Sequence, residues 1–296
     1  DWSSDVCSSD LTGVWVPEPT LIHDFVADRE AVVRLGKAWF WDVALGSDDM
    51  TACASCHGHA GADYRNVNTL APGFDGQFSG GVGPGGELSP DFFPTTVFAD
   101  PTDSQSEILR NVDDVVGSQG VLQRFFIGIG GEHVEICEDQ TDPVFNDGVV
   151  NTRAVTPRNS PSVLNAVFNI RQFWDGRANY VFNGVNITGA PTVIPTRGGG
   201  SALLQIAEAS QASQAVGPCL SPAEMSADGR QFSDIGYKIR HSIPLRYQTG
   251  DIVEELSSLG LLHGRGYAEL IDAAFADGPL EIFLSDEPSG VKTIVE

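Results

Sequence analysis

The sequence has little positive charge and no long apolar run. Its 296 residues contain 17 Lys+Arg against 40 Asp+Glu, which gives a formal net charge of −23. A surface this acidic repels phosphate groups, so we expect no binding to nucleic acid or to an anionic lipid surface. No apolar run approaches the roughly 18 residues that a membrane-spanning helix needs. We therefore expect a chain without a membrane span.

The first eleven residues have no apolar periodicity and are rich in Ser and Asp. Segment 1–11 can be back-translated into a common sequencing-library adapter, so we interpret it as an artefact; the alternative is a flexible arm. The natural start would then be missing, and the lack of a signal peptide carries no information.

Helical patterns dominate the rest of the chain, without sustained β-alternation or internal repeats. A helix is predicted over 29–41, after an N-cap at Asp28, with Val32, Leu35 and Trp39 on one face. Segment 66–150 has little periodicity and reads as a loop-rich insertion. The predicted fold class is all-α, a haem domain with long irregular loops. Further helices are expected at 104–116, from Ser160-Pro161 through Leu164, Val167 and Phe168, and at 201–214, 221–228, 231–241, 250–258 and 265–276.

The strongest chemical signal is the motif Cys53-Ala-Ser-Cys56-His57. Two thiols at this spacing can add to the vinyl groups of a porphyrin, and the adjacent imidazole can bind the iron, which predicts a covalent c-type haem. A zinc site would need a second pair of ligands. A thioredoxin-type redox pair would not need His57, and no βαβ pattern surrounds the motif.

The residues near the sixth coordination position of the iron, opposite His57, decide the function of such a haem. The sequence leaves two interpretations of this side open. Met50 is too near the motif to reach the opposite face, so Met225 is the one methionine available as a sixth ligand for an electron carrier. The neighbouring Glu224 could instead move a proton at an open iron. Ser221-Pro-Ala-Glu224 also fits a capping box, a purely structural role.

Three ordered blocks resemble the bacterial di-haem cytochrome c peroxidases, over residues 35 to 225. The first runs from Leu35-Gly-Lys-Ala-Trp-Phe-Trp-Asp42 through the haem motif to Gly61-Ala-Asp63. The others are Pro157-Arg-Asn-Ser-Pro-Ser-Val-Leu-Asn-Ala-Val-Phe-Asn169 with Phe173-Trp-Asp-Gly-Arg-Ala178, and Gln214-Ala-Val-Gly-Pro218 running to Glu224-Met225.

The resemblance implies a role for each matching residue. His57 would be the proximal ligand of the peroxidatic haem iron, with thioether bonds at Cys53 and Cys56. Gln214 and Glu224 match the distal Gln and the catalytic Glu. Trp174 matches the tryptophan that lies between the two haems in the family, and its structural alternative is a core aromatic residue. Asn159 matches a residue that helps to hold a calcium ion in the family, and its structural alternative is a turn residue.

The sequence also departs from the family pattern. It holds one Cys-x-x-Cys-His motif, whereas family members carry a second in a C-terminal domain. We therefore expect a fragment, with a peroxidatic haem domain over 12–285 and the start of a missing haem domain at 286–296, poorly active alone. No histidine aligns with the residue that occupies the iron in some resting enzymes, although His59 and His133 are candidates. Cys137 and Cys219 are not family landmarks, and whether they form a disulfide is left open.

The resemblance implies reduction of hydrogen peroxide to water in the periplasm. Electrons would arrive from a small cytochrome c or copper protein through the second haem. The alternatives are a single-haem electron carrier with Met225 as sixth ligand, and a relative that oxidises a partner protein.

Overall fold

The computed structural model describes residues 13–20, 22–58, 61–79, 81–195, 201–258, 260 and 266–275. The predicted adapter segment 1–11 and the expected domain start at 286–296 lie outside these residues. Within the described part of the chain, no helix is both long and apolar enough to cross a membrane.

Among the described residues the longest helix is α3 (Arg29–Trp41), which confirms the helix predicted over 29–41. Its N-cap Asp28 accepts hydrogen bonds from the amides of Glu30 and Ala31, which stabilises the first turn. Leu35 on its inner face is buried, and Val32 and Trp39 pack against the same core. The helix ends at Asp42, which also caps the short 3₁₀ turn η1 (Val43–Leu45).

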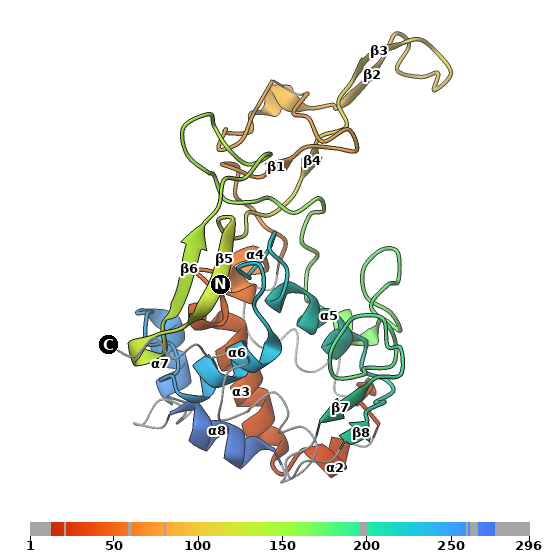
Figure 1. Cartoon of the computed structure of the whole chain (residues 1–296). Coiled ribbons are helices and arrows are strands. Elements are labelled where there is room, and N and C mark those ends of the chain that lie inside the picture. The colour runs from red at the N-terminus through yellow and green to blue at the C-terminus, as the bar shows by residue number, and fades with distance from the viewer. Residues whose placement is uncertain are drawn as a thin grey trace.

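A helical body surrounds α3. The helix α8 (Tyr267–Ala274) packs along α3, α6 (Phe232–Arg240) packs against α8, and α7 (Asp251–Ser258) also contacts α3. Figure 1 shows these helices gathered at one end of the molecule. These three helices confirm the predictions at 231–241, 250–258 and 265–276 within the described residues. The main core between them contains buried Leu35, Ala38, Ala44, Leu45, Met225, Ile235, Ile239, Leu245, Leu256, Tyr267, Leu270, Ile271 and Ala274.

The all-α prediction is wrong, because strands account for 16% of the residues against 28% in helices. Four separate two-stranded antiparallel sheets accompany the helices in the described structure. Each strand has only two to six residues, too few for an alternating pattern to stand out in the sequence. The pairs are β1 (Leu70–Ala71) with β4 (Val115–Val116), β2 (Thr96–Phe98) with β3 (Ile108–Asn111), β5 (Arg124–Ile129) with β6 (Glu135–Asp139), and β7 (Val193–Pro195) with β8 (Ser201–Leu203).

Segment 66–150 is therefore an ordered part of the fold and holds three of these sheets. Figure 1 shows the β1–β4 and β2–β3 pairs projecting from the body, whereas the β5–β6 hairpin lies back against it. The projecting part has a small core of its own around Leu70, Phe92 and Val112. The projecting part also contains the 3₁₀ turn η3 (Pro90–Phe92), which precedes β2. In the hairpin, the 3₁₀ turn η4 (Gly131–His133) joins β5 to β6.

Several predicted helices are absent. Residues 104–116 contribute β3 and β4, and 201–214 divides into β8 and the first half of α5 (Ser210–Cys219). The apolar face expected after Ser160-Pro161 does not form, because Leu164 is 70% exposed and the segment holds only η5 (Ala166–Phe168). Residues 222–225 form a turn in place of the predicted helix 221–228.

The remaining elements complete the architecture. The short helix α2 (Ile22–Phe25) precedes α3, and α4 (Cys53–Cys56) follows η1. Phe25 packs with Ile194, Leu204, Ile206 and Ala209 in a second cluster beside the β7–β8 pair.

Candidate functional site

The Cys-x-x-Cys-His motif folds as one helical turn. Cys53–Cys56 form α4, in which the amide of His57 donates to the carbonyl of Cys53 at 3.1 Å. At its start, the amide of Ala52 donates to the Ser55 hydroxyl at 2.9 Å. Because residues three and four apart on a helix are neighbours, this turn brings both thiols and the imidazole to one side.

The imidazole of His57 has a fixed orientation. Its Nδ1 lies 2.7 Å from the carbonyl oxygen of Pro161. A carbonyl can only accept, so Nδ1 carries the hydrogen and Nε2 keeps the lone pair that binds a metal. Metal-ligating histidines characteristically donate their other ring N–H in this way, so the geometry fits an axial ligand.

Ser160 and Pro161 support the motif instead of beginning a helix. The Ser160 hydroxyl donates to the carbonyl of Cys56 at 2.7 Å and lies 3.2 Å from both the amide of Asp63 and the hydroxyl of Ser118. The Cys56 turn is therefore tied to a segment about a hundred residues later in the chain.

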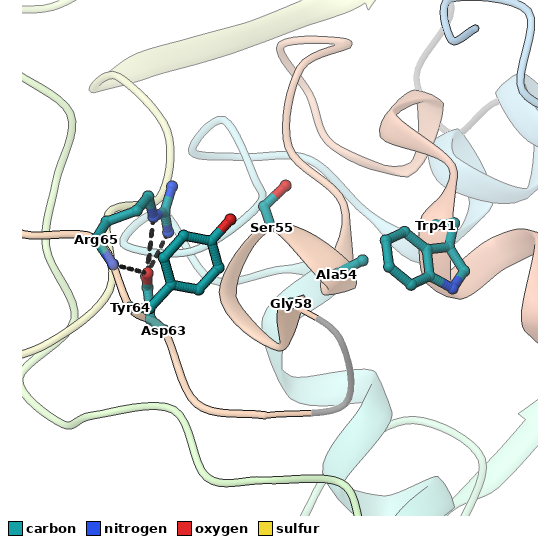
Figure 2. Close-up of a pocket in the computed structure, with 7 residues that line it drawn as sticks. All are labelled: Trp41, Ala54, Ser55, Gly58, Asp63, Tyr64 and Arg65. Carbon is teal, nitrogen blue, oxygen red and sulfur yellow. Dashed lines mark hydrogen bonds and ion pairs between the residues drawn. The ribbon is translucent and has the colours of Figure 1, made fainter. Parts of the chain in front are cut away.

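A small pocket of about 190 Å³ lies beside α4 (Figure 2). Its lining residues are Trp41, Ala54, Ser55, Gly58, Asp63, Tyr64 and Arg65. Burial by itself raises the pKa of Asp63, but hydrogen bonds and charge from Arg65, 2.5 Å away, outweigh it and lower the pKa overall. The same guanidinium lies 3.8 Å from Cys56 Sγ, so a fixed ion pair borders this thiol.

Cys53 faces the protein interior. Its side chain packs against the main core, which also holds Met225. Burial raises the pKa of Cys53 to about 12, and the charges of Cys219, Cys56 and Glu224 contribute in the same direction. Glu224 therefore lies close enough to the haem motif for the two groups to interact electrostatically.

Glu224 lies on the turn that follows α5 and is half-buried. The amides of Glu224, Met225 and Ser226 all donate to the carbonyl of Ser221 at 3.0 Å. Since this turn does not start a helix, the capping-box interpretation is wrong. Among the described residues, no hydrogen bond engages the Glu224 carboxylate, which leaves it available for chemistry.

The other distal candidates come from the same stretch of chain. Gln214 is half-buried on α5, ten residues before Glu224, and Met225 is 3% exposed in the main core. Met50 is 68% exposed and its sulfur lies 3.5 Å from Arg153 Nη2. Met225 therefore lies in the main core, Gln214 and Glu224 are partly buried on and just after α5, and Met50 lies at the surface.

Trp174 is a surface residue, 84% exposed, so the core-aromatic alternative is wrong. The guanidinium of Arg158 lies 5.0 Å from its ring centroid, and both Arg158 and Arg177 form ion pairs with Asp175. A large aromatic ring held in this way at the surface is suited to contact another domain or partner.

The calcium and histidine predictions receive no geometric support. Asn159 is exposed, and the described residues contain no cluster of three or more His, Cys, Asp or Glu that could hold a metal ion. His59 lies outside the described residues. His133 stacks on His241 at 4.7 Å between ring centroids, with Tyr237 beside it.

Cys137 and Cys219 are free thiols in this structure. Burial, followed by the charge of Glu135, raises the pKa of Cys137 to about 11. Burial also raises the pKa of Cys219, although Arg230 opposes the shift. Both groups are therefore protonated and unreactive near neutral pH.

The residues of the motif fit a covalently bound haem. Cys53 and Cys56 are unpaired thiols on one turn, and His57 presents Nε2 because its Nδ1 donates to a main-chain carbonyl. Sequence reasoning identified these three residues by their spacing. It missed Ser160 and Pro161, because their apolar neighbours suggested a helix.

Comparison with known proteins gives one family. The family model "Di-haem cytochrome c peroxidase" matches residues 128–283. No curated protein and no solved structure matches the chain. The matched region contains Pro161, Trp174, Gln214 and Glu224, and the family implies a haem cofactor, hydrogen peroxide as substrate and oxidoreductase activity of the peroxidase type. The chain belongs to the di-haem cytochrome c peroxidase family.

Proposed function

We propose that this chain reduces hydrogen peroxide to water at a c-type haem bound covalently to Cys53 and Cys56. His57 is the axial ligand, and Glu224 and Gln214 are the distal catalytic residues. The observation that carries the proposal is the 2.7 Å contact from His57 Nδ1 to the Pro161 carbonyl. It prepares Nε2 for iron within a turn that also presents two thiols.

The reaction consumes two electrons and two protons and yields two water molecules from one peroxide. When bound, the haem supplies the electron transfer that breaks the O–O bond. The role of Glu224 is to take a proton from one peroxide oxygen and return it to the other, which becomes the leaving water. An uncommitted carboxylate beside the haem motif supports this role.

The neighbours of Glu224 complete the distal side. The Gln214 amide orients peroxide by donating and accepting hydrogen bonds. Buried Met225 packs within the core and helps to exclude bulk water from the carboxylate. Arg65 and Asp63 keep a compensated charge pair beside Cys56.

Electrons are proposed to reach this haem from a second haem domain by way of Trp174. A small cytochrome c or copper protein is the proposed donor, and the periplasm is the proposed location. The ring of Trp174 is exposed and forms a cation–π contact with Arg158, which supports a contact of this surface with the second haem domain. The domain boundaries 12–285, with 66–150 as an insertion, and a calcium ion at Asn159 remain proposals that follow from the resemblance.

Substitution of Glu224 by Gln tests the catalytic proposal. In the haem-loaded protein, the second-order rate of reaction with hydrogen peroxide should fall about 10²- to 10⁴-fold, since Gln cannot cycle a proton. Stopped-flow absorbance at the Soret band measures this rate. The control Glu254→Gln removes an exposed carboxylate on α7 and should leave the rate unchanged.

The second candidate is electron transfer without turnover, which is favoured by the burial of Met225 in the core that Cys53 contacts. Met225→Leu separates the two functions. The peroxidase proposal expects a peroxide rate within a few-fold of wild type and an unaltered spectrum. A change from a low-spin to a high-spin spectrum in Met225→Leu, with no effect of Glu224→Gln, would establish the electron carrier instead.

A further inference from the structure

Residues 222–225, which include Glu224, form a turn and not part of a helix. The position of this turn therefore depends on its contacts with other segments. Its three amides converge on the single carbonyl of Ser221, and the amide of Ser47 donates to the carbonyl of Met225 at 2.8 Å. Both flanks of this turn are contacted by segment 117–139, which belongs to the predicted insertion.

Gly120 forms the first of these contacts. A Cβ added to Gly120 would lie 2.2 Å from the carbonyl oxygen of Ala223 and 2.6 Å from that of Glu224. The main chain at Gly120 therefore packs directly on the Glu224 turn, closer than any side chain would allow. Its own position is fixed, because its amide donates to Ala154 O at 2.8 Å and its carbonyl accepts from Arg153 Nη1 at 2.7 Å.

The same segment also borders the haem motif. The carbonyl of Gln119, next to Gly120, lies 3.8 Å from Cys56 Sγ and 3.4 Å from Arg65 Nη2. Two consecutive residues thus contact the thiol on one side and the Glu224 turn on the other. These two residues therefore link the haem attachment site to the main chain of Glu224.

Glu135 on the β5–β6 hairpin fixes the end of the Glu224 segment. Its Oε1 accepts from Arg230 Nη2 at 2.6 Å and from Lys238 Nζ at 3.1 Å, and the three side chains are 1%, 0% and 0% exposed. Arg230 in turn donates to the carbonyls of Leu45 at 2.9 Å and Cys219 at 3.5 Å. One buried carboxylate therefore orients the arginine that spans both ends of 219–230.

Main-chain pairing reinforces this connection. The amide of Asp228 donates to Arg124 O, and the amide of Phe126 donates to Asp228 O, each at 2.8 Å. The hairpin and the Glu224 segment thus share hydrogen bonds as well as the buried ion pairs.

We propose that Gly120 and Glu135 are positioning residues that hold the Glu224 carboxylate at the distance proton transfer requires. This inference rests on the proposed function of Glu224. Proton transfer needs heavy atoms about 2.6–3.2 Å apart, and a misplacement of about 1 Å can cost roughly a hundredfold in rate. A Cβ at Gly120 needs about 3.4 Å from a carbonyl oxygen where 2.2 Å is available, so it displaces the turn by about 1 Å.

Gly120→Ala and Glu135→Gln test the proposal in the haem-loaded protein. We expect the peroxide rate to fall about 10- to 100-fold in each, with a shifted pH profile of that rate. The matched controls are Gly128→Ala, whose added Cβ meets nothing within 4 Å, and Glu138→Gln, which is exposed on β6. Both controls should stay within twofold of wild type.

Double variants with Glu224→Gln show whether the effect passes through Glu224. We expect Gly120→Ala to change the rate of the Glu224→Gln protein by less than twofold. A further tenfold loss in that background, or a wild-type rate in folded Gly120→Ala, would overturn the proposal.

Hydrogen exchange in the peroxide-free protein keeps this test separate from the proposed function and from failure to fold. In folded Gly120→Ala, the amides of 224–226 should exchange faster than in the wild-type protein and in the control Gly128→Ala. Equal exchange rates would refute the positioning role. If Glu224→Gln leaves the peroxide rate unchanged while Gly120→Ala speeds the exchange of the 224–226 amides, the proposed function fails and the contact itself stands.

Discussion

Removal of one buried hydroxyl should measurably destabilise the helical body. The carboxylate of Asp42, fully buried at the end of α3, accepts from the Tyr267 hydroxyl at 2.6 Å and from the amide of Leu245 at 2.7 Å through Oδ2. Its Oδ1 accepts from the amide of Ala44 at 2.8 Å. Burial and then the charge of Asp42 raise the pKa of Tyr267, so its hydroxyl stays a donor at every pH of interest.

Tyr267→Phe deletes this donor and leaves the ring in place. A hydrogen bond to a charged group contributes about 1.5–3 kcal/mol to the free energy of unfolding. For a chain of this size, 1 kcal/mol corresponds to about 2 °C in melting temperature, so the expected fall is about 3–6 °C. Asp42→Asn should lower the free energy of unfolding further. The Asn side chain keeps one accepting oxygen, Oδ1, and its Nδ2 only donates, so it cannot accept from all three donors.

Thermal unfolding followed by circular dichroism measures the effect. The control Tyr64→Phe removes a hydroxyl from a tyrosine that is 80% exposed, and it should change the melting temperature by less than 1 °C. A Tyr267→Phe protein that melts within 1 °C of wild type would refute the assigned role of this hydrogen bond.

Three further predictions concern the haem, a thiol and the exposed tryptophan. Haem should stay with the denatured polypeptide after acidic acetone extraction, at one per chain, because the proposed attachment is by thioether bonds at Cys53 and Cys56; colour lost to the solvent would contradict this. At pH 8, a pKa of about 11 in place of 9.0 leaves Cys137 with roughly a hundredfold less thiolate, so iodoacetamide should label it about a hundredfold more slowly than free cysteine, and faster as the pH rises. Labelling as fast as that of the free amino acid would show that the thiol is not buried. Trp174→Phe should change the free energy of unfolding by less than about 1 kcal/mol, since only a cation–π contact is at stake, and a large loss in calorimetry would assign it a structural role.

The sequence predicted the elements whose signals are local. An N-cap at Asp28 and apolar residues at helical spacing identify α3, and the same periodicity identifies α6, α7 and α8. The strand pairs were missed because strands this short carry no readable alternation, and their partners can lie far along the chain, as in Leu70 with Val116.

The candidate site divides in the same way. Spacing alone identifies Cys53, Cys56 and His57, because their chemistry depends on adjacent side chains. Pro161 and Gly120 could not be found, since one acts through its carbonyl oxygen and the other through the absence of a side chain. Such contributions depend on which segments meet in space, and they leave no motif.

The residues that pack around the Cys-x-x-Cys-His motif lie far from it in the sequence, which affects the order in which the chain folds and binds its haem. Gln119 and Pro161, which contact Cys56 and His57, lie 63 and 104 residues later, and Met225, packed in the core that Cys53 contacts, lies later still. A chain made from its N-terminus therefore exposes both thiols long before these segments exist. The haem proposed at Cys53 is therefore expected to be attached before these segments pack onto the motif. A finished, haem-free protein would have to reopen its main core before the same bond could form.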